Sequence, residues 1–242
     1  MAVYTIADLH LPGKEGKNKS MEIFGNRWIG GVDKLIKNWC AVVDDGDTVV
    51  IPGDISWAMT LEEALEDFRL LDSLPGTKLI GKGNHDFWWA TASKMLRFFE
   101  ENNFRTLKIL YNNSYVADGF ALCGSRGWFS DEANQKTVGE VNWLKIVDRE
   151  TARLKISLES VLPEHSDLEK LVFLHFPPVW NASVSEDIIT LMHEHGVKRC
   201  FYGHIHGVYT SDAIFDYGGI RFEMISADYL GFCPRKIVGR GN

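Results

Sequence analysis

The sequence has few cysteines, no long apolar run and no excess of basic charge over its 242 residues. No segment approaches the roughly 20 consecutive apolar residues of a membrane-spanning helix, so we expect no membrane association. No basic stretch followed by an apolar run opens the chain, so we expect no signal peptide and a cytoplasmic location. The four cysteines form no CxxC pair, and we expect buried free thiols at Cys40, Cys123, Cys200 and Cys233.

The charge balance argues against a long nucleic acid as partner. The 26 Lys and Arg residues against 33 Asp and Glu residues give a net charge of −7, so no general basic field exists to hold a polyanion. A small phosphorylated substrate remains compatible with this charge if a metal supplies local positive charge. No repeat and no linker-like stretch divides the chain, so we expect a single domain over residues 1–242 with no evident protein partner.

Apolar, β-branched runs alternate with helical patterns over the first hundred residues. Strands are expected at 3–7, 48–52 and 78–81, and a longer one at 115–123. Apolar residues at helical spacing predict a long helix over 137–162. The later strands lie closer together along the chain, which predicts an α/β (α+β) layered fold with mixed sheets.

Residue types that bind metals follow directly on five of these apolar runs. Loops at the carboxyl ends of parallel strands meet in one crevice, so we expect these side chains to converge. The clusters are Asp8-Leu9-His10, Gly53-Asp54, Gly83-Asn84-His85-Asp86, His175 and Gly203-His204-Ile205-His206.

Such a set of side chains suits a two-metal hydrolytic site. Imidazole and carboxylate ligands favour manganese, iron, zinc or nickel, and the absence of cysteine from the clusters argues against a structural zinc site. Two ions roughly 3.5–4 Å apart need a bridging carboxylate, and Asp54 is the natural bridge because it stands alone after a glycine. Alternation in Asp8-x-His10 and His204-x-His206 is expected to aim both members of each pair at the same region.

The order DxH, GD, GNHD, H and GHxH, running from Asp8 to His206, resembles the signature of the calcineurin-like metallophosphoesterase superfamily. The first block departs from the usual pattern after its ligands, where Leu11 stands in place of a glycine. The resemblance implies a four-layer double β-sandwich flanked by helices. It also implies a dinuclear metal-dependent phosphohydrolase that cleaves a phosphodiester or a phosphomonoester by metal-activated hydroxide.

The resemblance further implies a role for each residue of the five blocks. Asp54 would bridge two divalent ions, for which manganese is expected and iron, zinc or nickel are alternatives. His85 would donate a hydrogen bond or proton toward the leaving oxygen, and Asp86 would orient His85. The remaining ligands would form one set per metal, namely Asp8, His10 and His206, and Asn84, His175 and His204.

Two further features leave alternatives open. Arg126 lies in a polar, glycine-flanked segment, where it either occupies a surface turn or binds the substrate phosphate through its bidentate fork. Trp57, Trp88 and Trp89 follow ligand loops, and they either pack in the core or wall the substrate cleft.

Other functions must be weighed against a phosphohydrolase. A non-catalytic binding scaffold of the same fold would be expected to lose ligands, whereas this sequence keeps them all. A nuclease would share the site but should add a basic track or a stacking platform for the strand. A phosphoprotein phosphatase would need a docking surface, for which the short segments between the blocks offer little material. Retention of His85 tilts the expectation slightly toward phosphodiesters.

Overall fold

The computed structural model describes residues 1–13, 21–128 and 143–237, and two β-sheets form its centre. The first sheet has the order β13-β1-β2-β3-β4, and β13 alone runs antiparallel to its neighbour. The bounds of these strands are Arg235–Lys236, Val3–Thr5, Thr48–Ile51, Thr77–Ile80 and Leu107–Ile109.

The second sheet has the order β11-β12-β10-β7-β6-β5. Its four central strands are parallel, and the edge strands β11 and β5 pair antiparallel. The bounds are Ile214–Tyr217, Ile220–Met224, Arg199–Tyr202, Glu169–Leu174, Phe120–Ser125 and Ser114–Ala117. A separate hairpin joins β8 (Val179–Trp180) to β9 (Ser183–Val184).

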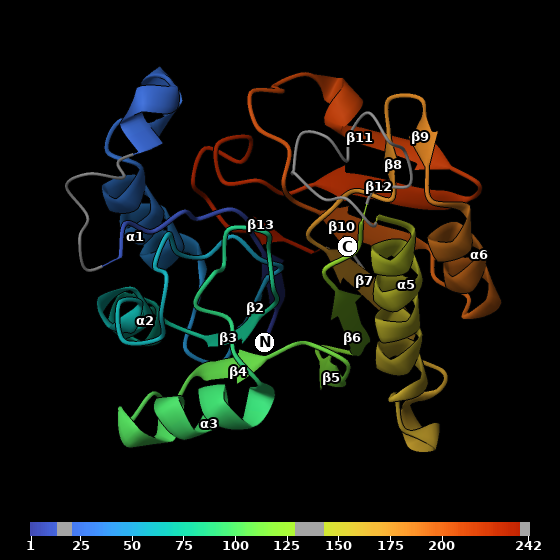
Figure 1. Cartoon of the computed structure of the whole chain (residues 1–242), viewed down its shortest axis with the longest axis horizontal. Coiled ribbons are helices and arrows are strands. Elements are labelled where there is room, and N and C mark those ends of the chain that lie inside the picture. Colours follow the sequence, from blue (N-terminus) through green and yellow to red (C-terminus); the bar gives the residue numbers. More distant parts are fainter. Residues whose placement is uncertain (14–20, 129–142, 238–242) are drawn as a thin grey trace.

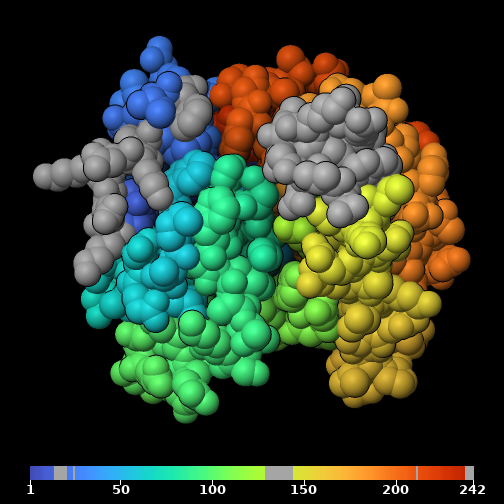
Figure 2. All heavy atoms as spheres, in the orientation of Figure 1, coloured from blue at the N-terminus to red at the C-terminus, as the bar shows by residue number. Residues whose placement is uncertain are grey.

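Helices cover the outer face of each sheet, as Figure 1 shows. The first sheet carries α1 (Gly31–Val42), α2 (Leu65–Ser73) and α3 (Ala92–Glu101), and the second carries α5 (Trp143–Glu159) and α6 (Glu186–Glu194). The colours of Figure 2 separate accordingly, with the blue-to-green part of the chain beside the yellow-to-red part. Short 3₁₀ helices complete the described elements: η1 (Met21–Phe24), η2 (Asn26–Trp28), η3 (Pro163–His165) and η4 (Ser211–Ala213).

The inner faces of the two sheets share one apolar core. Val50 and Leu79 from the first sheet pack with Phe173 and Phe201 from the second, and the two phenylalanine rings stack with centroids 5.1 Å apart. A second apolar cluster lies between the first sheet and its helices, and a third lies between the second sheet and its helices. The architecture is therefore helix, sheet, sheet, helix, which confirms the expected double β-sandwich flanked by helices.

Three local expectations need correction. The strand expected at 115–123 is a hairpin, because Asp118 and Gly119 turn the chain with φ of 47° and 79° between β5 and β6. The helix expected over 137–162 ends at Glu159, and its expected first turns at 137–142 lie outside the described residues. The thiols of Cys123 and Cys200 are buried as expected, whereas Cys40 is exposed on α1 and Cys233 is half-buried.

None of the helices in the described part of the chain has the length and apolar character needed to cross a membrane.

Candidate metal centre

The carboxyl ends of parallel strands from both sheets meet at one edge of the sandwich. Asp8 follows β1 and Asp54 follows β2 in the first sheet, while His175 follows β7 and His204 follows β10 in the second. The sheets are tied together there, because the backbone N–H of Ala7 donates to the carbonyl of Ile225 at 2.8 Å. The expected convergence of the five clusters is thus present in the structure.

One group of three ligand atoms comes from Asp8, His10 and His206. These atoms all lie within 4.8 Å of one another, and the Nε2 atoms of His10 and His206 are 3.2 Å apart. The carboxylate of Asp8 is held in place by the backbone N–H of His204, which donates to both of its oxygens at 2.9 and 3.0 Å. Two ring nitrogens and a carboxylate oxygen at this spacing match a divalent-metal site.

A second group comes from Asp54, His175 and His204, again with ligand atoms within 4.8 Å of one another. The side-chain oxygen of Asn84 lies 2.7 Å from Nε2 of His175 and 3.0 Å from Nδ1 of His204. The amide oxygen therefore faces the same point as the two imidazoles. This is the membership expected for the second metal.

Asp54 lies between the two groups. Its Oδ2 atom is 3.7 Å from Nε2 of His10, in the first group, and 3.6 Å from Nε2 of His175, in the second. Its other oxygen accepts from the backbone N–H of His85 at 2.8 Å, which fixes the carboxylate. One oxygen that faces both groups is what a bridging ligand requires.

Backbone strain marks the same loops. Asp8, His10, Asp54 and His204 adopt φ of 58°, 46°, 51° and 69°, in the left-handed region that ordinary residues avoid. Such strain persists only where the surroundings enforce it, and it gathers at functional sites. The left-handed turns, rather than simple strand alternation, aim the paired side chains at one region.

Glycines let the carboxylates approach the backbone. A Cβ atom on Gly83 would lie 2.0 Å from Oδ1 of Asp54, and one on Gly203 would lie 2.5 Å from Oδ2 of Asp8. Both distances are shorter than any van der Waals contact. Gly83 and Gly203 must therefore lack a side chain, because Asp54 and Asp8 occupy the space that a Cβ atom would need.

The electrostatics of the site call for added positive charge. Burial raises the pKa of Asp8 to about 6, and burial followed by the charges of Asp86 and Asp8 raises the pKa of Asp54 well above its ordinary range. Burial and neighbouring imidazoles lower the pKa of His10 and His175 well below the usual value. Neutral imidazoles beside buried carboxylates fit a cation site, because a bound cation compensates the buried negative charge. The Nδ1 atoms of both histidines also lack a hydrogen-bond partner among the described residues.

Asp86 is buried beneath the site and binds loop backbone. Its oxygens accept from the backbone N–H groups of Gly83, Asp54 and Ile55 at 2.8 to 2.9 Å, and from the indole of Trp88 at 3.0 Å. Within the described part of the chain, no hydrogen bond joins this carboxylate to the His85 ring. These contacts show that Asp86 holds the Asp54 and Asn84 loops together, and its support of His85 stays a prediction.

Asp228, which was not among the residues expected from the sequence, is buried and holds a candidate ligand. Its Oδ1 atom is 3.0 Å from Nδ1 of His206, and its Oδ2 atom accepts from the N–H of Gly207 and the hydroxyl of Tyr209, both at 3.1 Å. Burial alone would lower the pKa of His206, but the hydrogen bond to Asp228 and nearby negative charge together outweigh it, and the pKa is raised. A signal was present in the sequence, because Asp228 also follows an apolar strand, β12.

A cavity of about 400 Å³ lies over these groups. Among the three tryptophans considered above, Trp57 lines it, whereas Trp88 is buried against Phe68 with ring centroids 4.9 Å apart. The ring of Trp89 packs on that of Tyr111 with centroids 5.3 Å apart, against the apolar core of the first sheet. His85 lines the cavity, which places its ring beside the candidate ligands.

Arg126 is adjacent to His175, whose backbone N–H donates to its carbonyl at 3.1 Å, but it is not among the described residues that line the cavity. Its guanidinium is 3.4 Å from Oε1 of the fully buried Glu150, 4.4 Å from the Trp128 ring and 6.0 Å from the Phe176 ring. The Phe176 ring in turn is 4.3 Å from the ring of His204. A direct contact of Arg126 with substrate phosphate stays a prediction.

The sequence of residues 1–208 matches the family model described as calcineurin-like phosphoesterase. The chain belongs to this family. The family and the two Asp/His groups together indicate a metal-dependent phosphoesterase. No protein of curated function matches the sequence significantly.

Solved structures of similar fold include the phosphopantetheinyl hydrolase PptH from Mycobacterium tuberculosis. It is 13% identical, with a TM-score of 0.57, and the match covers 98% of this chain and 95% of that one. The protein TT1561 of Thermus thermophilus is 14% identical, with a TM-score of 0.55 and 97% of each chain covered. At such identities the likeness shows the fold alone.

Proposed function

We propose that this calcineurin-like phosphoesterase hydrolyses a small phosphate ester at a dinuclear metal centre. The observation that carries the proposal is the position of Asp54, whose Oδ2 atom faces His10 of one ligand group and His175 of the other. Asp8, His10 and His206 would hold one ion, and Asn84, His175 and His204 the other. Bound ions would lower the pKa of water and neutralise phosphate charge.

The chain's own residues would then orient the ester and assist departure of the leaving group. His85 is the group proposed for this step, because its ring lines the cavity beside the ligands and its backbone is fixed by Asp54. Burial and the nearby His206 lower the pKa of His85, so the ring is neutral and would assist by donating an N–H hydrogen bond to the leaving oxygen. Manganese is the ion we expect, since the mixed nitrogen and oxygen ligands suit it.

The test measures nitrophenolate release from an aryl phosphate monoester and a bis-aryl phosphodiester. The protein is stripped of metal and reloaded with Mn²⁺, with Asp54→Asn as the site variant and Asp216→Asn as the matched control. Asp216 carries an exposed carboxylate on β11. We expect metal-dependent release that Asp54→Asn abolishes and Asp216→Asn preserves.

The ratio of the two activities then decides between monoester and diester substrates. Absence of both release and bound metal would refute the proposal and favour a binding scaffold of the same fold. A metal content near two ions per chain, lowered in Asp54→Asn, supports the dinuclear centre independently of turnover.

A further inference from the structure

Aromatic side chains form much of the wall of the cavity over the candidate ligands. The floor carries His10, Asp54, His204 and His206, and His85 stands beside them. The rest of the lining is mostly apolar: Met21, Trp28, Trp57 and Tyr209, with Gly207. At about 400 Å³ the cavity falls within the roughly 300–1,000 Å³ of small-ligand sites.

Tyr209 is fixed in this wall from outside. The guanidinium of Arg27 lies 3.8 Å from the ring centroid, and the Tyr209 hydroxyl donates to Asp228 at 3.1 Å. Arg27 is itself held by a hydrogen bond to the carbonyl of Asp228 at 3.0 Å. Arg27 lies over one face of the ring, and these contacts position Tyr209 in the cavity wall before any ligand binds.

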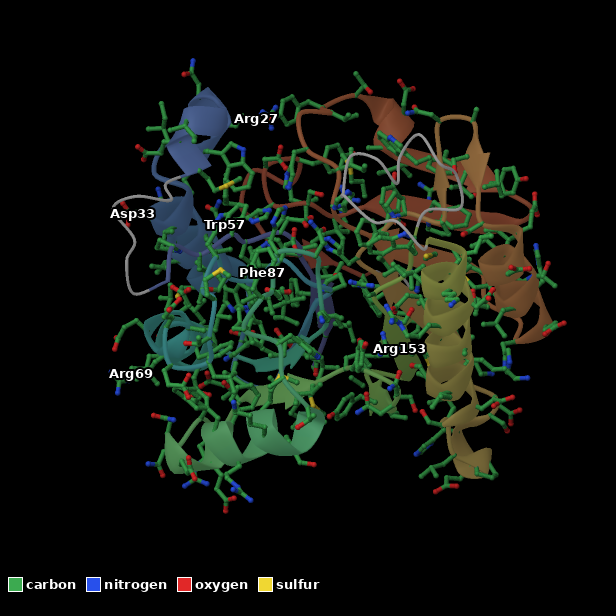
Figure 3. All side chains as sticks on the ribbon, viewed as in Figure 1. Arg27, Asp33, Trp57, Arg69, Phe87 and Arg153 are labelled. Carbon is green, nitrogen blue, oxygen red and sulfur yellow. The ribbon has the colours of Figure 1, made fainter. Side chains whose placement is uncertain are left out.

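Trp57 brings a second aromatic surface next to the reacting groups. Its ring stacks on His10 with centroids 5.0 Å apart and planes 25° apart, and it lies 4.4 Å from the ring of His85. Trp28 meets the same ligands edge-on, at 5.9 Å from His10 and 5.4 Å from His206. Figure 3 shows Trp57 between Arg27 and Phe87 in this view, away from Arg153 on α5.

We propose that the substrate is a phosphate ester bearing one planar aromatic or heteroaromatic ring, which stacks in this cavity against Tyr209 and Trp57. This inference rests on the proposed function, because the ligand groups would hold the phosphate end of the same molecule. Ring-on-ring stacking favours flat unsaturated groups over saturated rings of equal size.

The neighbouring cavity limits what else the molecule carries. It measures about 230 Å³, shares His10, Met21 and Trp28 with the first, and has Glu22 and Asp33 in its wall. Carboxylates there repel a second phosphate and accept hydrogen bonds from hydroxyl or amino groups. We therefore expect the substrate to carry a single phosphate group, as a monoester or a diester, and neutral or cationic groups elsewhere.

The test measures binding rather than turnover. Phenylphosphonate and cyclohexylphosphonate are titrated calorimetrically into the full chain loaded with Mn²⁺. The two probes share the phosphonate and differ in planarity of the ring. We expect phenylphosphonate to bind about tenfold more tightly. Tyr209→Leu should reduce this preference to about twofold or less, whereas Tyr209→Phe, which keeps the ring, should retain it.

Equal affinities for the two phosphonates would overturn the inference, as would no binding of either. So would a preference that survives in both Tyr209→Leu and Trp57→Leu, each checked for metal content. A 5′-phosphonate of adenosine distinguishes the ligand sources: tighter binding than phenylphosphonate indicates a nucleobase, and equal or weaker binding indicates a simple aryl group.

Nitrophenyl-ester hydrolysis by the same samples separates this inference from the proposed function. Hydrolysis without a ring preference defeats the inference and leaves the phosphohydrolase standing. A ring preference without metal-dependent hydrolysis of any ester defeats the proposed function.

Discussion

The carboxylate of Asp228 lies 3.0 Å from Nδ1 of His206, so it faces the ring nitrogen opposite the one aimed at the candidate metal group. This contact fixes the tautomer, because a proton on Nδ1 leaves Nε2 free to bind a metal. Burial opposes ionisation of Asp228, but the hydrogen bond from His206 lowers its pKa. Asp228 therefore acts as a positioning residue for the candidate metal ligand His206, and it is not itself a ligand in either group.

We predict that Asp228→Asn weakens Mn²⁺ binding by about 10- to 100-fold. The amide keeps the shape of the side chain but loses the negative charge and one acceptor. Titration calorimetry of metal-free protein with Mn²⁺ measures the change. Asp216→Asn removes an exposed carboxylate instead, and it should bind Mn²⁺ as the wild type does. An unchanged affinity in Asp228→Asn would remove this residue from the site.

His85 gives a prediction that depends on the leaving group. We expect His85→Ala to lower kcat by about 100-fold or more for an ester with an alkoxide leaving group. The loss should be much smaller for a nitrophenyl ester, whose leaving group departs without protonation. His193→Ala on the exposed surface of α6 serves as the control. Equal losses on both esters would argue for a binding role, and metal content checks that the ligands stay in place.

The ligand clusters could be predicted from the sequence because each one follows directly on an apolar strand. The strand directions then place Asp8, Asp54 and His175 at the same edge. Asp228 also follows a strand but stands as a lone aspartate three residues beyond an apolar stretch, without a histidine or asparagine to draw attention to it. Its role depends on where His206 lies in space, which spacing along the chain does not reveal.

The roles of side chains near the clusters were the least predictable part. Asp86 directly follows His85 in sequence, but the buried N–H groups of Gly83, Asp54 and Ile55 compete for its oxygens. The hairpin at Asp118 was hidden because the apolar pattern continues on both sides of its two-residue turn. Tertiary hydrogen bonds and turn geometry decided both cases.

Arg126 offers a prediction on stability. Glu150 is fully buried, and its Oε1 atom is shared by Arg126 at 3.4 Å and by Arg153. We expect Arg126→Ala to lower the free energy of unfolding by about 1–3 kcal/mol, because part of the compensation for a buried charge is lost. Urea unfolding measures this, with Arg69→Ala on the exposed side of α2 as control.

The kinetics of Arg126→Ala address the separate prediction of a substrate contact. A rise in KM with kcat unchanged would indicate that the guanidinium also binds phosphate. In the unfolding experiment, an Arg126→Ala variant that unfolds at the same urea concentration as the wild type would show that Arg126 does not compensate the buried charge of Glu150.

Asp67 provides a pH-dependent test of the loop that leads into the cavity. This buried carboxylate on α2 accepts from the backbone N–H of Gly13 at 2.9 Å and from the Ser56 hydroxyl, and Trp57 follows Ser56 directly. Burial raises the pKa of Asp67 to about 6 from the ordinary 3.8, although the hydrogen bond from Ser56 opposes this. Between about pH 4 and 6 the folded protein thus keeps a proton that the unfolded chain has released.

The sign follows from this proton. Protonated Asp67 stabilises the folded state fully at a pH below 3.8, the pKa of the group in the unfolded chain. This stabilisation is lost as the pH rises through about 6, so the free energy of unfolding falls between about pH 4 and 6. The loss is about 2–3 kcal/mol, since each pH unit between the two pKa values corresponds to about 1.4 kcal/mol. The side chain of Asp67→Asn cannot ionise. Between pH 4 and 6, the free energy of unfolding of this variant should therefore fall by about 2–3 kcal/mol less than that of the wild type. Glu66→Gln removes an exposed charge from the same helix and should follow the wild type. Parallel curves for metal-free wild type and Asp67→Asn would refute the assignment.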